Sequence, residues 1–230
     1  DWQIFSWFLP VVPAPGKRWV KNPISILSRW KIFDNIRRSL VPFAITVLIL
    51  LGWLILPSTL FWTLVVTGII IFPIFISSTW AFIRKPKDVN LLFHLKYSWT
   101  NIENVFIKTL YALICLPYEA YSNLKSILLA LWRMLISRKK LLEWSTSSQS
   151  ASSGKPKLMD SYTSMWIEPV LALIVIVYLS ANDSIRLVLA GPILFMWSLA
   201  PLITLWSSLP SPSQGAMLSD KQVVFLRKVS

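Results

Sequence analysis

The stretch that decides the fold runs from Ser39 to Ile83 and reads SLVPFAITVLILLGWLILPSTLFWTLVVTGIIIFPIFISSTWAFI. None of its 45 residues carries a charge. The hydrocarbon core of a bilayer takes about 20 apolar residues as a helix, so this stretch predicts two crossings rather than one. We expect the first crossing over roughly residues 41–56 and the second over residues 60–82. Pro57-Ser58-Thr59 marks the turn between them.

The composition of the whole chain agrees with a membrane protein. The 230 residues are 55% hydrophobic and 14% charged, with a mean hydropathy of +0.59, values typical of integral membrane proteins. The net charge of +13 comes from 23 basic and 10 acidic residues. Because the basic residues lie in short segments flanking apolar runs, they favour anchoring at an anionic cytoplasmic leaflet over nucleic-acid binding. We therefore expect the lipid bilayer as a partner, and no nucleic acid.

Residues 1–38 are predicted to lie at the membrane surface. Residues 1–22 are rich in aromatic side chains and prolines, which exclude a regular helix through their middle and suit the headgroup level, with stacking on sugar rings as the alternative. Asn22-Pro23 signals a helix start. The helix that follows has an apolar side and a basic side, and Asp34 can pair with Arg38. It is predicted to lie on the membrane and to lead directly into the first crossing, with the anchoring side chains Arg29, Lys31, Arg37 and Arg38.

Residues 84–160 are predicted to form cytoplasmic or interfacial helices and a Ser-rich loop. Thr100-Asn101-Ile102-Glu103 reads as a capping box that starts a helix, and two apolar stretches follow at 104–117 and 121–137. Basic residues on both sides require an even number of crossings between them. We expect two interfacial helices, with a short hairpin broken near Pro117 as the alternative. The expected membrane-surface set is completed by Arg138, Lys139 and Lys140.

Residues 161–207 predict a second transmembrane hairpin. Its crossings are expected over about 162–180 and 185–206, joined by a short turn at Ala181-Asn182-Asp183. Residues 208–230 are read as a Pro/Ser linker and the start of a next domain. The predicted fold class is therefore an all-α membrane protein, with about four transmembrane helices in two hairpins plus basic amphipathic interfacial helices. The distribution of Lys and Arg predicts a multi-pass protein whose loops and two chain ends are cytoplasmic.

The residues that could carry chemistry are few. The lone His94 is expected at the surface, and the lone Cys115 is expected to be buried and inert. Glu168 is expected near a cytoplasmic helix end, where it can reach interface water, with a functional site inside the span as the alternative. The sequence lacks phosphate-binding glycine motifs and zinc-type cysteine pairs. It also lacks a D-x-D pattern and close pairs of carboxylates. The sequence itself thus predicts a membrane module with no catalytic and no metal-binding residues.

Two blocks of sequence carry a resemblance to a known family. NPISILSRWKIFDNIRRSLVP from Asn22 and LLALWRMLISRKKLLEWSTSSQ from Leu128 resemble strings in the membrane region of bacterial cyclic β-1,2-glucan synthases. The resemblance covers most of the chain. It implies the membrane-embedded part of a processive inner-membrane glycosyltransferase that makes cyclic β-1,2-glucan from UDP-glucose. It also implies flanking glycosyltransferase and glycoside-phosphorylase-like domains in the same polypeptide.

The same resemblance implies where the chemistry and the sugar would lie. UDP-glucose and a divalent metal, Mg or Mn, would be held by an upstream catalytic domain, and no cofactor by this chain. The chain would anchor that domain, and its spans would border the path of the glucan. Trp2 and Trp7 are the candidates for contact with the glucan acceptor, because they stand nearest the implied catalytic motif and an indole face stacks well on a sugar.

Two other interpretations remain open from the sequence. One is a non-enzymatic membrane scaffold or small transporter, which predicts polar side chains facing one another at mid-membrane. The two long uncharged spans argue against it. The other is a purely passive anchor, with the sugar path elsewhere.

Overall fold

The structure, a computed structural model, describes residues 2–14, 18–83, 90–137 and 158–208. In chain order the elements are η1 (Trp2–Phe8), β1 (Val11–Ala14), β2 (Arg18–Lys21), α1 (Ile26–Leu54), α2 (Thr59–Ile83), α3 (Leu91–Ile114), α4 (Leu116–Trp132), η2 (Arg133–Ser137), α6 (Leu158–Ser164), α7 (Ile167–Asn182) and α8 (Ser184–Ser208). Helices α1, α2 and α8 are long and apolar enough to cross a membrane, and the bent pair α6–α7 gives a fourth span if it counts as one. The predicted helical membrane fold is confirmed.

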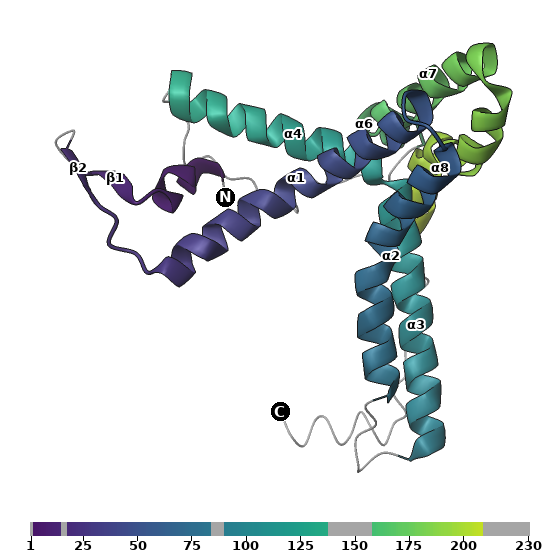
Figure 1. Cartoon of the computed structure of the whole chain (residues 1–230), viewed down its shortest axis with the longest axis horizontal. Coiled ribbons are helices and arrows are strands. Elements are labelled where there is room, and N and C mark those ends of the chain that lie inside the picture. The colour runs from purple at the N-terminus through teal and green to yellow at the C-terminus, as the bar shows by residue number, and fades with distance from the viewer. Residues whose placement is uncertain (1, 15–17, 84–89, 138–157, 209–230) are drawn as a thin grey trace, which may run out of the picture.

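The helices form two arms that meet at α7 and α8 (Figure 1). In one arm α4 packs along α1, and η1 contacts both of them. The β1–β2 hairpin lies at the far end of this arm, which we call the N-terminal arm (η1, β1, β2, α1 and α4). The other arm consists of α2 and α3, which run side by side (Figure 1). The chain passes from one arm to the other twice, at the turn between α1 and α2 and at the junction between α3 and α4.

The first crossing and the amphipathic segment before it form one continuous helix. Helix α1 has 29 residues and contains Pro42 without a break. At 1.5 Å per residue it is about 43 Å long, which exceeds the roughly 30 Å hydrocarbon core of a bilayer. Its basic N-terminal half therefore extends beyond the apolar length that a bilayer can cover. The predicted pair within that half is confirmed, with Arg38 Nε 3.1 Å from Asp34 Oδ2.

The helix start predicted at Asn22-Pro23 is wrong by three residues. Ser25 is the N-cap of α1, and its Oγ accepts a hydrogen bond from Ser28 N at 3.2 Å. Asn22 is engaged elsewhere, because its side-chain amide donates to the carbonyl oxygens of Trp7 and Leu9 at 2.6 and 2.9 Å. Its side chain thus ties the β-hairpin to the end of η1. As predicted, the proline-rich residues do not continue as a regular helix.

The capping box predicted at Thr100 is also wrong. Helix α3 starts ten residues earlier, where Asn90 accepts a hydrogen bond from Leu92 N, and Thr100 Oγ1 donates to Lys96 O inside the helix. Only one residue, Cys115, separates α3 from α4. Helix α3 packs along α2 and α4 along α1, and neither is among the described helices that are long and apolar enough to cross a membrane. The choice between two interfacial helices and a short hairpin broken near Pro117 stays a prediction.

The second hairpin differs from the prediction at its first span. The expected crossing over residues 162–180 is interrupted around Met165 and Trp166, where α6 and α7 form an angle of 69°. Helix α7 alone has 16 residues, about 24 Å. The turn predicted at Asp183 is confirmed and is very short, because Asp183 Oδ1 accepts hydrogen bonds from the first backbone N–H groups of α8.

The main core lies where the two arms meet and draws on α1, α2, α7 and α8. Its fully buried members include Ile49, Trp53, Val66, Ala172, Leu194 and Trp197. The rings of Trp53 and Trp197 pack at 5.4 Å between centroids, and Trp53 Nε1 donates to Thr63 Oγ1 at 2.9 Å. A Cβ on Gly52 would approach the Cβ of Trp62 to 2.5 Å, so the close crossing of α1 and α2 requires glycine at this position.

Candidate functional site

Both predicted sugar-contact residues lie on η1, but they differ in availability. The indole N–H of Trp2 donates to Ser39 Oγ at 2.8 Å, so this half-buried side chain fixes η1 to α1. Trp7 is 38% exposed. Its contact with Asn22 is made by its backbone carbonyl, which accepts a hydrogen bond from the Asn22 side chain. An indole that stacks on a sugar must present a free face. Of the two, Trp7 has the side chain more available for such contact.

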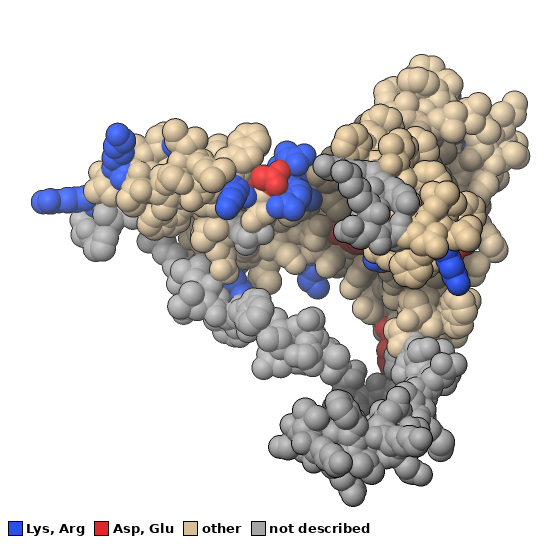
Figure 2. Space-filling view, turned by 90° about the horizontal axis from the view of Figure 1, so that it is seen from below, with Lys and Arg blue, Asp and Glu red and all other residues tan. Residues whose placement is uncertain are grey.

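The predicted anchoring residues that the structure describes lie on α1 in the N-terminal arm, where Figure 2 shows basic side chains clustered beside one acidic side chain. Arg37 and Arg38 are exposed and both pair with Asp34, and Lys31 is exposed as well. Arg29 has a structural role, because its Nε donates to Phe8 O at 2.9 Å and so links α1 to η1. The other predicted members, Arg138, Lys139 and Lys140, lie outside the described residues.

A second site, which we call the break site, lies where the chain passes from α3 to α4. In a continuous helix the carbonyl of Leu113 would accept from the backbone N–H of residue 117, but Pro117 has none. The indole of Trp197 on α8 replaces it, donating to Leu113 O at 3.1 Å. Close by, Tyr111 OH donates to Thr204 Oγ1 at 3.3 Å, and the Cys115 sulfur lies 3.7 Å from the same hydroxyl.

Glu168 completes the break site from α7. Helix α4 has no side-chain cap of its own, and Glu168 Oε1 accepts a hydrogen bond from the Tyr118 N–H at 3.3 Å. The carboxylate thus caps the N-terminus of α4, where backbone N–H groups lack intrahelical partners. The expectation that Glu168 reaches interface water is wrong. Its side chain is 0% exposed, because the first turn of α4 covers it.

The other two singled-out residues have different outcomes. Cys115 is buried, as predicted, and burial raises the pKa of its thiol. His94 is buried rather than at the surface, and its Nε2 lies 3.0 Å from Phe82 O. It therefore joins the start of α3 to the end of α2. The expectation of a surface histidine is wrong because α2 covers this side of α3.

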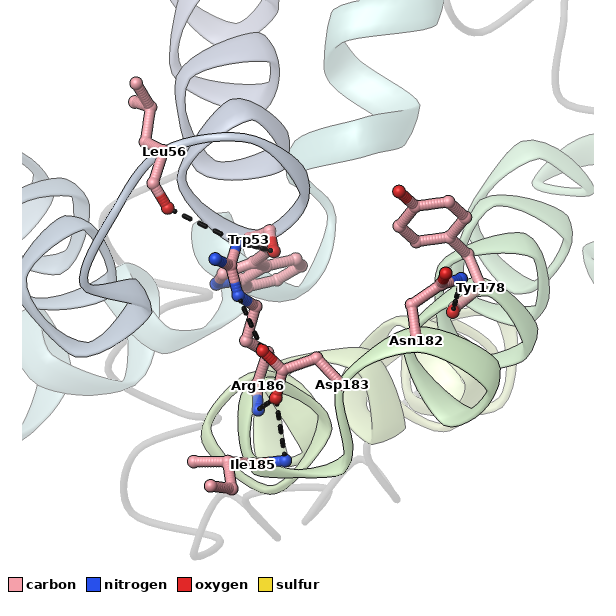
Figure 3. A network of polar contacts seen from close by, with 7 residues as sticks. All are labelled: Trp53, Leu56, Tyr178, Asn182, Asp183, Ile185 and Arg186. Carbon is pink, nitrogen blue, oxygen red and sulfur yellow. Dashed lines mark hydrogen bonds and ion pairs between the residues drawn. The ribbon is translucent and has the colours of Figure 1, made fainter.

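Sequence reasoning missed Arg186, which joins the two hairpins (Figure 3). Its Nε lies 3.0 Å from Asp183 Oδ2, and its Nη1 donates to the carbonyl oxygens of Trp53 and Leu56 at 3.2 and 3.3 Å. Trp53 lies at the C-terminal end of α1 and Leu56 lies two residues beyond that end, where carbonyls lack intrahelical partners. A cation there links the α1–α2 turn to the α7–α8 turn. The sequence around Arg186 predicts at most a local pair with Asp183. It gives no indication of a partner more than 100 residues earlier in the chain.

Taken together, the apolar helices and the basic arm define a helical membrane protein. No family model matches the chain. Over its entire length it is 28% identical, across 237 aligned positions, to part of the cyclic β-(1,2)-glucan synthase NdvB of Rhizobium meliloti (strain 1021). The chain spans 8% of the length of that synthase, which is consistent with a fragment of such an enzyme. The resemblance seen in the sequence is confirmed.

Proposed function

We propose that this chain is the membrane-embedded part of a processive inner-membrane glycosyltransferase that makes cyclic β-1,2-glucan from UDP-glucose. The observation that carries the proposal is the similarity of the entire chain to part of a cyclic β-(1,2)-glucan synthase. The arrangement of helices supports it, because the chain combines three or four potential spans with a basic, aromatic arm. Such an arm suits the boundary between a membrane and a domain outside it.

In this proposal the N-terminal arm holds the catalytic domain against the cytoplasmic leaflet. Arg37 and Arg38 are free to meet lipid phosphates, since Asp34 neutralises only part of their charge. Arg29 and Trp2 keep η1 in place between α1 and α4. The spans would border the path of the glucan, and both chain ends would be cytoplasmic and continue into the glycosyltransferase and glycoside-phosphorylase-like domains.

The chemistry of transfer is assigned to the upstream domain. Within the part of the chain that the structure describes, no three His, Cys, Asp or Glu side chains are grouped so that they could hold a metal ion. The described residues therefore do not fit a divalent metal with a nucleotide diphosphate, which needs several oxygen ligands. UDP-glucose and Mg or Mn would bind outside this chain, and its own residues would position the acceptor.

Elongation by Trp7 variants of the full synthase tests the acceptor role. Trp7→Ala is expected to slow elongation and Trp7→Phe to retain much of it, because a phenyl ring keeps a stacking face. Chain lengths are measured with radiolabelled UDP-glucose in isolated membranes. Trp206→Ala, which removes a 77% exposed indole from α8, is the matched control. Wild-type elongation by Trp7→Ala would remove the acceptor role.

A scaffold or passive anchor is the rival function for the spans. To distinguish this rival function from a role in the glucan path, the four potential spans are exchanged for unrelated apolar helices that keep the same turns and orientation. Glucan synthesis that survives this exchange at the wild-type rate would support an anchor alone. Loss of synthesis with normal membrane insertion would support participation of the spans in the glucan path.

A further inference from the structure

The break site contains a carboxyl group that the proposed function does not use. Glu168 is completely buried, and only Oε1 has a partner, the Tyr118 N–H. Oε2 has no hydrogen-bond partner among the described residues. Burying an ionised carboxylate without compensation is expensive, and so is burying a polar oxygen without a partner. The site is therefore incomplete as it stands.

Neighbouring charges do not complete it. The charged group that Glu168 faces from α4 is Glu119, a second carboxylate, which opposes a further negative charge. Cys115, just after the end of α3, is close enough to interact electrostatically with Glu168, and its sulfur in turn contacts the hydroxyl of Thr204 on α8. Asp160 on α6 is exposed, and the part of α1 that joins the core carries no charged side chain. Apart from the backbone N–H groups at the start of α4, the described surroundings of Glu168 contribute a second carboxylate and no cationic side chain.

The helix geometry around Glu168 is of the kind that binds small cations in membrane proteins. Two interruptions meet here, between α3 and α4 at Cys115 and between α6 and α7 near Met165. Met165 and Cys115 pack in one buried cluster with Ala200 of α8. Interrupted helices in bundles expose backbone groups to a ligand, and ionisable side chains beside them bind protons or Na⁺.

We propose that Glu168 is a binding site for a small monovalent cation, a proton or Na⁺, held at the junction of the two interrupted helix pairs. The cation neutralises the carboxylate and gives Oε2 the partner that it lacks. An ion of this size suits a side chain that is completely buried and is held against the first turn of α4. The cation thereby sets how firmly Glu168 caps α4, and so how firmly the N-terminal arm is held to α7. This inference does not depend on the glucan assignment.

The test uses dicyclohexylcarbodiimide, an apolar reagent that adds the O–H of a protonated buried carboxyl across its C=N bond. The adduct rearranges to a stable N-acylurea without losing any atom. The complete chain in lipid nanodiscs is labelled across a pH series, with Na⁺ exchanged for choline at constant ionic strength, and the modified peptide is found by mass spectrometry. We expect labelling at Glu168 and its loss in Glu168→Gln. Glu119→Gln, which removes the neighbouring carboxylate, is expected to retain labelling at Glu168 while moving its loss to lower pH.

The two cations are distinguished by how labelling is lost. Loss with rising pH alone identifies a proton site, and additional loss with Na⁺ at constant pH identifies Na⁺ as the competitor. The unfolding temperature gives a second readout. Without Na⁺, the wild type should become less stable as pH rises, because the neutral carboxyl is lost, and Glu168→Gln should lack this component. The proposal would be overturned if the unfolding temperature depended on pH and Na⁺ in the same way in the wild type and in Glu168→Gln. It would also be overturned if labelling at Glu168 changed neither with pH nor with Na⁺.

Discussion

Arg186 shows how one side chain can define the relation between two hairpins. It approaches the open carbonyls at the end of α1 and is held there by Asp183 on its own turn (Figure 3). Its side chain is 29% exposed, so the pair is only partly screened by solvent. The arrangement satisfies helix-end carbonyls that a turn of apolar residues could not satisfy.

Replacing this cation should loosen the contact between the hairpins. Arg186→Met keeps an unbranched, though shorter, side chain and removes its donors, so the Trp53 and Leu56 carbonyls lose their Arg186 partner. We expect a loss of about 1–3 kcal/mol in the free energy of unfolding. Unfolding is followed in detergent by circular dichroism. Arg37→Met, which breaks an exposed pair with Asp34, should leave the unfolding temperature unchanged; equal stability of both variants would contradict the role of Arg186.

Single residues also show which features the sequence could reveal. Asp34 and Arg38 stand one turn apart on one helix, so their pairing follows from local spacing. Glu168 and His94 are buried by elements that the spacing around them does not specify. The cap on α4 comes from a residue 50 positions later, and the cover over His94 comes from α2. Long-range packing of this kind is what the sequence could not predict.

At the scale of elements, the two crossings of the first hairpin followed directly from the uncharged run Ser39–Ile83. Helix boundaries outside it did not. Asn22 and Ser25 are both good N-caps, as are Asn90 and Thr100, and tertiary contacts select between them. In the second hairpin, the apolar composition of residues 162–180 predicted one crossing, yet the chain bends at Met165–Trp166 just before Pro169. Composition indicates that a segment is apolar, but it does not fix the direction of its helix axis.

The crossing of α1 and α2 gives a prediction at this scale. Gly52→Ala places a methyl group against the Trp62 side chain, and such overpacking costs about 1–3 kcal/mol. Gly191→Ala is the matched control within α8, because a Cβ there meets no atom within 4 Å. The control should be neutral or slightly stabilising, since alanine favours a helix. Thermal unfolding of both variants is the measurement, and a Gly52→Ala protein as stable as Gly191→Ala would show that the helices do not cross so closely.

At the scale of the whole molecule, Arg186 places the α1–α2 turn beside the α7–α8 turn. Both turns must therefore lie on one side of the membrane, and the Lys and Arg distribution predicts the side opposite the cytoplasm. In a Cys115→Ala background, Ser58→Cys and Ser184→Cys should both react with an impermeant maleimide added from outside spheroplasts. Ser153→Cys, in the sequence-predicted cytoplasmic loop, should react only after lysis. Labelling of the two turns from opposite sides would exclude this topology.

The arrangement of the two arms also provides a route by which a structural change among the membrane helices could move the N-terminal arm. The N-terminal arm carries the basic side chains seen in Figure 2 and the exposed Trp7, and α1 and α4 connect it to α7 and the rest of the helices. The connection through α4 includes the break site, so a change in the protonation or ion binding of Glu168 would alter how the N-terminal arm is held. This link is where the proposed cation site and the proposed glucan function would meet.

The most direct test of the central claim is a transplant into the Rhizobium meliloti synthase. The matching 8% of that enzyme is replaced by this chain, and cyclic β-1,2-glucan is measured in cells that lack their own synthase. We expect this chimera to make cyclic glucan, whereas a chimera with unrelated apolar helices of equal number and orientation should make none. A transplant chimera that inserts stably into the membrane but makes no more glucan than this control would contradict the assignment.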